Sequence, residues 1–310
     1  MATVDLTTPP PPPSGLLDAL PRRVGLTLPE LRLAARLAGG APLPFELEDV
    51  ADTSGHALEN RLGQSRASVE DEAYAAALAT LHDPTETLTR RGLLDGEALD
   101  EGLAGALGLL ATPTVAVDLD VVVEHVRARA WHREADGAVA TLATVDGVVF
   151  ELAWFPATAW AAELARAAVL PSDQSLRGTT LPDVIDVPFE LLDAAAEAVR
   201  SNRSDLLPVL AARHSGAAVD ADGSPIRDVD LASMLSALSI DPRGRLRALG
   251  ADVSSGETRL VGVVSWVLLA DGWRALRPRR DGDDQRVEVR RVESDDLPAD
   301  LAFVLAEVVA

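Results

Sequence analysis

The order in which the hydrophobic spacing changes along the chain constrains its fold most. In three segments of the first 110 residues, apolar residues recur every three or four positions, as on one face of a helix. From Val115 they alternate with polar residues, and a second alternation begins near Leu246. Successive side chains of a strand point to opposite faces, so alternation indicates half-buried strands. The chain is therefore predicted to be an α+β protein with two layers, a sheet and helices.

Seven helices, and a further short one over residues 205–213, are predicted from this spacing and from end signals. The clearest start is Thr27-Leu28-Pro29-Glu30, which combines a capping box with proline in the first turn. Gly39-Gly40 would end that helix. The other six are expected over residues 69–81, 97–110, 156–170, 186–200, 228–238 and 296–309.

The predicted strands fall into two sets, each containing an Asp-Gly turn. Asp146-Gly147 and Asp271-Gly272 each separate two apolar runs, which is a strong hairpin signal because the tight turn needs positive φ. The expected strands are 115–121, 126–131, 139–145 and 148–154 in the first set, and 245–248, 260–270, 273–277 and 286–290 in the second. A further short strand is expected over residues 45–50.

The two sets suggest an internal duplication with quasi-two-fold symmetry. Residues 106–113 and 235–242 each read as a helix end followed by proline, and the turns at Asp146 and Asp271 are taken as equivalent. The alternative is coincidence, since Asp-Gly turns are common. We expect a disordered proline-rich tail over residues 1–22. A single domain over 23–310 follows, with halves 23–170 and 184–310, linker 171–183 and one central, mostly antiparallel sheet.

The charge and composition exclude several classes of partner. The net charge is −21 and every basic residue is arginine, which disfavours nucleic acid and anionic lipid. The chain has no cysteine, so disulfides and thiolate chemistry are excluded. The longest apolar run, residues 260–270, is too short for membrane insertion, and no signal peptide is recognised. We expect a cytoplasmic protein, a monomer or a weak dimer.

No motif predicts catalysis, a cofactor or a metal site. The five histidines form no metal-binding pair motif, and a phosphate-binding loop would need lysine. Residues 220–224 and 281–284 resemble parts of calcium loops but lack the full pattern of ligands, so solvated turns are expected. We predict no catalytic, cofactor-binding or metal-binding residues and no enzyme activity. A hydrolase using Asp, His and Ser is the enzyme alternative.

Several segments, in their order along the chain, resemble the EspG family. Residues 26–31 followed by Gly-Gly and by Pro42-Leu43-Pro44-Phe45 resemble the opening helix and strand of that family. Residues 88–93 are similar to its "Leu-Thr-x-x-Gly-Leu" stretch, and residues 111–119 to its first long strand. The resemblance covers roughly residues 25–310 and is strongest up to about residue 170.

The resemblance implies a cytosolic chaperone of actinobacterial type VII (ESX) secretion. EspG proteins have a central antiparallel sheet with quasi-two-fold symmetry between helical bundles. They hold a helical secretion substrate, typically the PPE half of a PE–PPE pair, by its apolar tip. The runner-up is a non-catalytic scaffold or interaction protein of the same fold.

The family's client contacts map to two segments of this sequence. These are a strand–strand loop at residues 121–125 and part of the C-terminal helical bundle at residues 229–238. The loop is shorter than in better-known members, so the expected partner is PPE-like or another helical hairpin, such as a WXG-type protein. The predicted partner-binding residues are Val122, Val123, Glu124, His125, Met234, Leu235 and Leu238. The alternative for each apolar one is an ordinary core position.

Overall fold

The fold is described from a computed structural model. It describes residues 21–45, 74, 76–78, 80–172, 174–178, 181–239, 243–282 and 284–309. Nearly all of the predicted tail, including the proline run, lies outside these residues, as do most of the predicted strand 45–50 and part of the predicted helix 69–81. The first strand begins at Arg22, the last residue assigned to the tail.

The chain divides into two compact units, each built from segments that are not contiguous in sequence. Unit 1 comprises Met1–Val117, Arg129–Trp160 and Val253–Thr258. Unit 2 comprises Asp118–Ala128, Ala161–Asp252 and Arg259–Ala310. Residues 118–128, from the first half of the sequence, thus belong to unit 2, which the second half mainly forms. Residues 253–258, from the second half, belong to unit 1.

The strands form a large antiparallel sheet. The strands of the first half, in hydrogen-bonded order, are β1 (Arg22–Thr27), β7 (Val149–Pro156), β6 (Ala138–Thr144), β5 (Val126–Ala135) and β4 (Val115–Val123). Those of the second half are β9 (Val219–Asp220), β8 (Val184–Pro188), β13 (Asp284–Arg291), β12 (Gly272–Asp281), β11 (Arg259–Leu269) and β10 (Gly244–Asp252). A separate small hairpin pairs β2 (Leu94–Asp95) with β3 (Ala98–Leu99).

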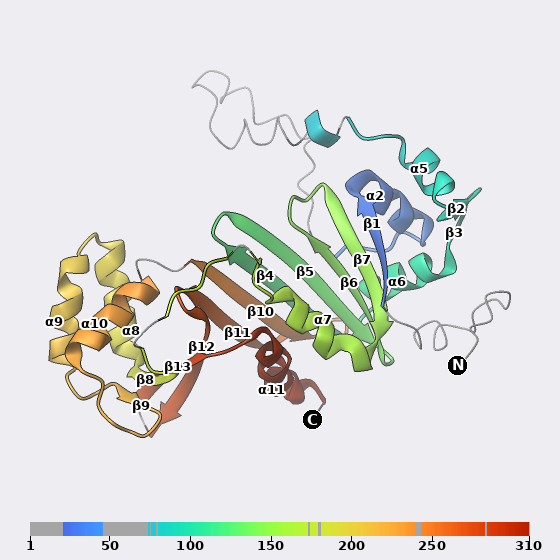
Figure 1. The fold of residues 1–310 in the computed structure, drawn as a ribbon. Coiled ribbons are helices and arrows are strands. Elements are labelled where there is room, and N and C mark those ends of the chain that lie inside the picture. The colour runs from blue at the N-terminus through green and yellow to red at the C-terminus, as the bar shows by residue number, and fades with distance from the viewer. Residues whose placement is uncertain are drawn as a thin grey trace, which may run out of the picture. The chain divides into compact units, whose positions relative to one another are not determined.

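The helices are distributed over both units (Figure 1). Unit 1 contains α2 (Leu28–Leu37), α5 (Pro84–Arg90) and α6 (Glu101–Ala111). Unit 2 contains α8 (Phe189–Arg200), α9 (Leu207–Arg213), α10 (Asp228–Ser239) and α11 (Leu297–Val309). Of these, α8, α9 and α10 form a bundle beside β8 and β9 (Figure 1). Helix α7 (Trp160–Ala167) begins at the last residue of the second segment of unit 1.

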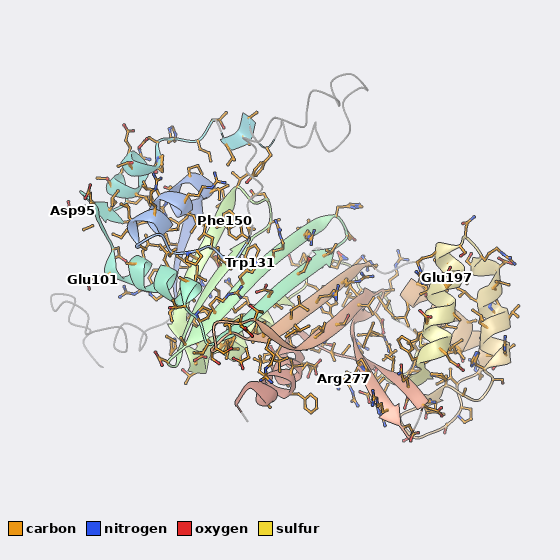
Figure 2. All side chains as sticks on the ribbon, turned by 180° about the vertical axis from the view of Figure 1, so that it is seen from behind. Asp95, Glu101, Trp131, Phe150, Glu197 and Arg277 are labelled. Atoms are coloured by element: carbon orange, nitrogen blue, oxygen red, sulfur yellow. The ribbon has the colours of Figure 1, made fainter. Side chains whose placement is uncertain are left out.

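The core of unit 1 forms where α2 and α6 cover one face of β5, β6 and β7. The predicted capping box starts α2, with Thr27 and Glu30 bonded to each other's backbone N–H groups. Phe45 stacks on Phe150 and lies at a tilt to Trp131, with 5.0 Å between ring centroids in both pairs. Figure 2 labels Trp131 and Phe150 at the centre of this cluster. Each buried aromatic ring contributes a large apolar area to this core.

Unit 2 has a helical core and a separately packed last helix. Helices α8, α9 and α10 share a buried apolar cluster with β8. Helix α11 lies over β10 and β11. A Cβ added at Gly262 would lie 2.8 Å from the side chain of Val304, and one added at Gly250 would lie 3.2 Å from it. Glycine at these two positions therefore allows the helix to approach the sheet closely.

The two halves have the same strand connectivity, but one predicted equivalence is wrong. In each half, an early strand pairs with the last strand of a four-stranded meander. Asp271 precedes the third strand of its meander, whereas Asp146 lies between the third and fourth. The matching place in the first half is held by Asp136-Gly137, where φ is 52° and 77°. A duplication remains a hypothesis.

Three other differences from the predicted elements have local causes. Residues 184–188 form strand β8, although Asp186-Val187-Pro188 was interpreted as a helix start. Helix α8 therefore begins at Phe189, which is 47 % exposed, and it buries Leu191, Ala195 and Ala198. Helix α6 begins at Glu101, later than predicted, because Asp100 accepts a hydrogen bond from the N–H of Leu103.

Candidate functional site

The first predicted contact region is a tight turn between β4 and β5. Glu124 and His125 alone separate the two strands, and Glu124 adopts a positive φ of 53°. The loop is therefore as short as the sequence indicated. Both turn residues are exposed, whereas Val122 and Val123 are half-buried at the end of β4.

The turn is fixed to neighbouring segments of unit 2 through Glu124. Its backbone N–H donates to the carbonyl oxygen of Arg243 at 2.7 Å. Its carboxylate accepts hydrogen bonds from Arg243 Nη2 and Gln174 Nε2, both at 3.2 Å. Arg243 in turn donates to the carbonyl oxygen of Ser175 at 2.7 Å. The turn is thus held to the start of β10 and to the segment that the sequence analysis treated as a linker.

A glycine that the sequence analysis missed permits this arrangement. A Cβ added at Gly244, the first residue of β10, would lie 2.4 Å from the carbonyl oxygen of Val122. Backbone atoms cannot move aside as a flexible side chain can, so β4 and β10 can approach this closely only with glycine here. A glycine two positions after a proline gives little signal of such a contact in the sequence.

The second predicted contact region is mostly core. Met234 and Leu235 of α10 are 1 % and 0 % exposed and belong to the apolar cluster of α8, α9, α10 and β8. Leu238 is half-buried and packs against the same cluster. For Met234 and Leu235 the structure therefore matches the core alternative, and neither offers exposed surface to a partner.

An open face of the sheet in unit 2 presents a different group of residues. Arg245, Arg247 and Leu249 alternate along β10 on its exposed side. Leu249 pairs with Val263 of β11, and these side chains are 38 % and 40 % exposed. We call these four residues the open-face cluster. The alternation over residues 245–248 predicts a strand, but the exposure of its outer side is seen only in the structure.

The charge of this cluster contrasts with that of the whole chain. Within the part of the chain that the structure describes, Arg245 and Arg247 form no ion pair, whereas exposed Arg127 pairs with Asp120. Two unpaired guanidinium groups beside an exposed apolar pair resemble an interaction surface, where arginine is enriched. In a chain of net charge −21, they form a local positive site.

The described residues offer no arrangement suited to metal chemistry. No group of three His, Asp or Glu side chains among them is placed to hold a metal ion. His132, which is buried, accepts a hydrogen bond at Nδ1 from the indole N–H of Trp160 at 3.2 Å. None of the described helices is both long and apolar enough to cross a bilayer.

Comparison with solved structures identifies the fold. The chain is similar to the type VII secretion system chaperone EspG5 of Mycobacterium tuberculosis, solved in complex with a PE25–PPE41 dimer. The match has a TM-score of 0.59 and covers 92 % of this chain and 96 % of that one. The chain has the fold of EspG5. The resemblance to the EspG family noted in the sequence is thereby confirmed in the fold.

The similarity to EspG5 is structural and not a matter of sequence. The two chains are 11 % identical over the match. No family model matches the sequence, and no curated protein matches it significantly. The EspG5 comparison therefore gives the architecture, and the binding residues of this chain have to be argued from its own surface.

Proposed function

We propose that this protein is a chaperone of type VII secretion that binds a helical secreted partner. The similarity to EspG5 carries the proposal, because it spans nearly the full length of both chains. EspG5 was solved with the PE25–PPE41 dimer, which gives the class of partner. For this chain, the partner is a PPE-like protein or another helical hairpin.

In this proposal the protein works by covering an apolar surface and performs no chemistry. An export substrate with an exposed apolar tip would aggregate, and a bound chaperone keeps that tip out of water. The protein acts in the cytoplasm before export and returns to its free, monomeric state. The shared strand connectivity of its halves arose by duplication.

The open-face cluster is the proposed contact surface, together with the β4–β5 turn. Leu249 and Val263 supply apolar area for a helix tip, and Arg245 and Arg247 border it. The fixed position of Glu124 makes the turn a rigid edge of this surface rather than a loop that must be ordered on binding. A preformed surface avoids the entropy cost of ordering.

Co-purification tests the proposal. The protein is mixed with the PE25–PPE41 dimer and, separately, with a WXG-type helical hairpin, and complexes are measured by size-exclusion chromatography with light scattering. We expect a stable complex with at least one of them. Failure to bind any helical secreted hairpin would contradict the proposed function.

Variants then test the surface. Leu249→Glu and Arg247→Glu should weaken the complex, since each places a negative charge on the open-face cluster. Arg36→Glu, at an exposed position of α2, changes the net charge as much as Arg247→Glu and should leave binding unchanged. Equal losses for Arg36→Glu and Arg247→Glu would mean that general charge, and not this surface, determines binding.

A further inference from the structure

The sheet of unit 2 separates between two of its strands. Strand β11 pairs with β10 along nearly its whole length, but with β12 only from Trp266 to Leu269. Among the described residues, no strand pairs with residues 259–265 of β11 or 276–281 of β12 on the sides that face each other. We call this gap the fork. Figure 2 labels Arg277 beside it.

The fork contains a cavity of about 520 Å³. This volume lies within the range of ligand pockets, ~300–1,000 Å³. Its walls come from β11, β12, Glu288 of β13 and α11, whose Phe303 is 84 % exposed. The unpaired part of β11 is about 23 Å long at strand spacing, enough for an extended segment of similar length.

The backbone of β11 presents hydrogen-bonding groups to the fork. The carbonyl oxygen of Leu268 accepts from the N–H of Arg243, so this residue bonds on the β10 side. Bonding direction alternates along a strand, and the register with β10 is regular from Arg245 to Gly250. The N–H and C=O groups of Val263 and Ser265 therefore point into the fork.

The opposite edge, on β12, is protected against strand addition. The N–H of Val292 donates to the carbonyl oxygen of Trp273, so alternate residues from Trp273 bond towards β13. Pro278 belongs to the other set, and its missing N–H lies on the fork side. Arg277, Arg279 and Arg280 flank it. Proline and charged residues are the means by which proteins block edge strands.

The edge of β11 has no such protection. Residues 260–263 are Leu-Val-Gly-Val, and Leu260 is 59 % exposed. An open apolar edge is a template for another strand. The contrast between a blocked and an open edge across one cavity indicates that β11 is the accepting strand.

The reachable charges in the fork are positive. Arg277 bonds to Glu288 and Asp300, whose side chains are only 13 % and 11 % exposed, while those of Arg277 and Arg279 are 38 % and 52 % exposed. An incoming strand would therefore meet guanidinium groups before carboxylates. Acidic side chains on one face of that strand would complement them.

We propose that the fork binds an extended acidic segment of a partner protein, which adds as a strand to the open edge of β11. Its alternate acidic side chains face Arg277 and Arg279, and Phe303 covers it from α11. This mode, in which main-chain bonds give affinity and alternate side chains give specificity, is known for sheet edges. The site shares Val263 with the open-face cluster but goes beyond the proposed function, because it binds an extended strand through main-chain groups rather than a helix tip through side chains.

The probe is a fluorescein-labelled seven-residue peptide of alternating valine and glutamate, and binding to the full chain is followed by anisotropy. We expect saturable binding that weakens by about tenfold or more when alternate peptide amides are N-methylated, since each lost main-chain bond removes part of the affinity. A second peptide, with lysine in place of each glutamate, should bind at least about tenfold more weakly than the valine–glutamate peptide, because its ammonium groups would face guanidinium groups. The proposal is overturned if the glutamate peptide, its N-methylated form and the lysine peptide bind equally well, or if none of them binds.

Two variants of Val263 test whether the main-chain N–H of the β11 edge binds the peptide. Val263→Pro removes the N–H that faces the fork and should weaken peptide binding by about tenfold. Val263→Thr keeps that N–H and nearly the same shape and should bind as the parent does. Equal affinity of the two variants would overturn the proposal. The proposal would also fail if the parent protein associated with itself, if the peptide competed with that association, and if Val263→Pro abolished it. A second copy of the chain would then occupy the fork.

Discussion

Gly244 and Arg274 show how single residues hold unit 2 together. Gly244 allows a backbone approach that no side chain would tolerate. Arg274 is fully buried and pairs with buried Asp271 at 2.7 Å, while its other terminal nitrogen donates to the carbonyl oxygen of Pro182 at 2.8 Å. It thus connects the β11–β12 turn to the segment before β8. The two residues fix the strand positions on which both proposed surfaces depend.

Replacing Gly244 by alanine should destabilise the protein. The added Cβ would lie 2.4 Å from the carbonyl oxygen of Val122, so β4 or β10 must shift. We expect a loss of about 1–3 kcal/mol in the free energy of unfolding, as for other overpacked sites. Urea denaturation measures it. The matched control is Gly105→Ala in α6, where the new methyl group meets nothing within 4 Å and should stabilise by about 0.5–1 kcal/mol.

Replacing Arg274 by methionine should cost more. The change leaves the carboxylate of Asp271 buried without its partner, and breaking a buried pair costs about 3–5 kcal/mol. Removing both charges in the Asp271→Ala, Arg274→Met double variant should restore part of that loss. A double variant that is less stable than Arg274→Met in urea denaturation would contradict this account.

Residue-scale features were the least predictable from the sequence. The capping pair Thr27 and Glu30 was predicted because both partners lie within one turn of chain. The role of Gly244 depends on Val122, which is 122 positions away in the sequence, and no local pattern carries that information. Met234 and Leu235 were assigned to a binding surface, but helical spacing alone cannot show which apolar face of a bundle helix is covered.

At the scale of elements, α2 depends on a carboxylate that serves three partners. Glu30 accepts from the backbone N–H of Thr27 at 2.8 Å and from Arg91 Nη1 at 3.1 Å. Burial raises the pKa of Glu30, but the hydrogen bonds from Thr27 and Thr87 and the charge of Arg91 outweigh it, so the net shift is downward. The ionised form is thus favoured in the folded state.

Glu30→Gln should therefore destabilise the protein in a pH-dependent way. A group whose folded pKa is lowered contributes stability above its unfolded pKa, about 4.3, and loses it as the pH falls through the folded value. We expect a loss of about 1 kcal/mol at pH 7, typical of a helix cap. The difference between parent and variant should shrink below about pH 4. A constant difference from pH 7 to pH 3 in urea denaturation would contradict it.

Elements with a strong local signal were predicted, and those determined by tertiary pairing were not. Strand β11 and helix α11 were placed to within about two residues, since β11 is a long apolar run before an Asp-Gly turn and α11 has a long helical periodicity. Strand β8 was missed because Asp-Val-Pro also begins helices, and only its pairing with β13 makes it a strand. The fork was not predictable, because the continuous apolar run of β11 does not show where β12 stops pairing with it.

At the scale of the whole molecule, the two units are interleaved along the chain. Unit 1 takes in Val253–Thr258, and the N–H of Val253 donates to the carbonyl oxygen of Thr114 at 3.0 Å. Unit 2 takes in Asp118–Ala128, where Glu124 bonds to Arg243. The predicted halves 23–170 and 184–310 do not coincide with the units. Each half contains one hairpin tip that belongs to the unit formed mainly by the other half.

We therefore expect neither half to fold alone. A protein of residues 23–170 would expose Thr114 and the end of β4, and one of residues 184–310 would lack the turn that Arg243 holds. Each should show the broad, poorly cooperative unfolding of a chain with an incomplete core, whereas the full chain should unfold in one transition. Circular dichroism and tryptophan fluorescence should give the same midpoint for the full chain. Two separated transitions, or a half that unfolds cooperatively by itself, would show that the units are independent domains, and the single-domain interpretation would fail.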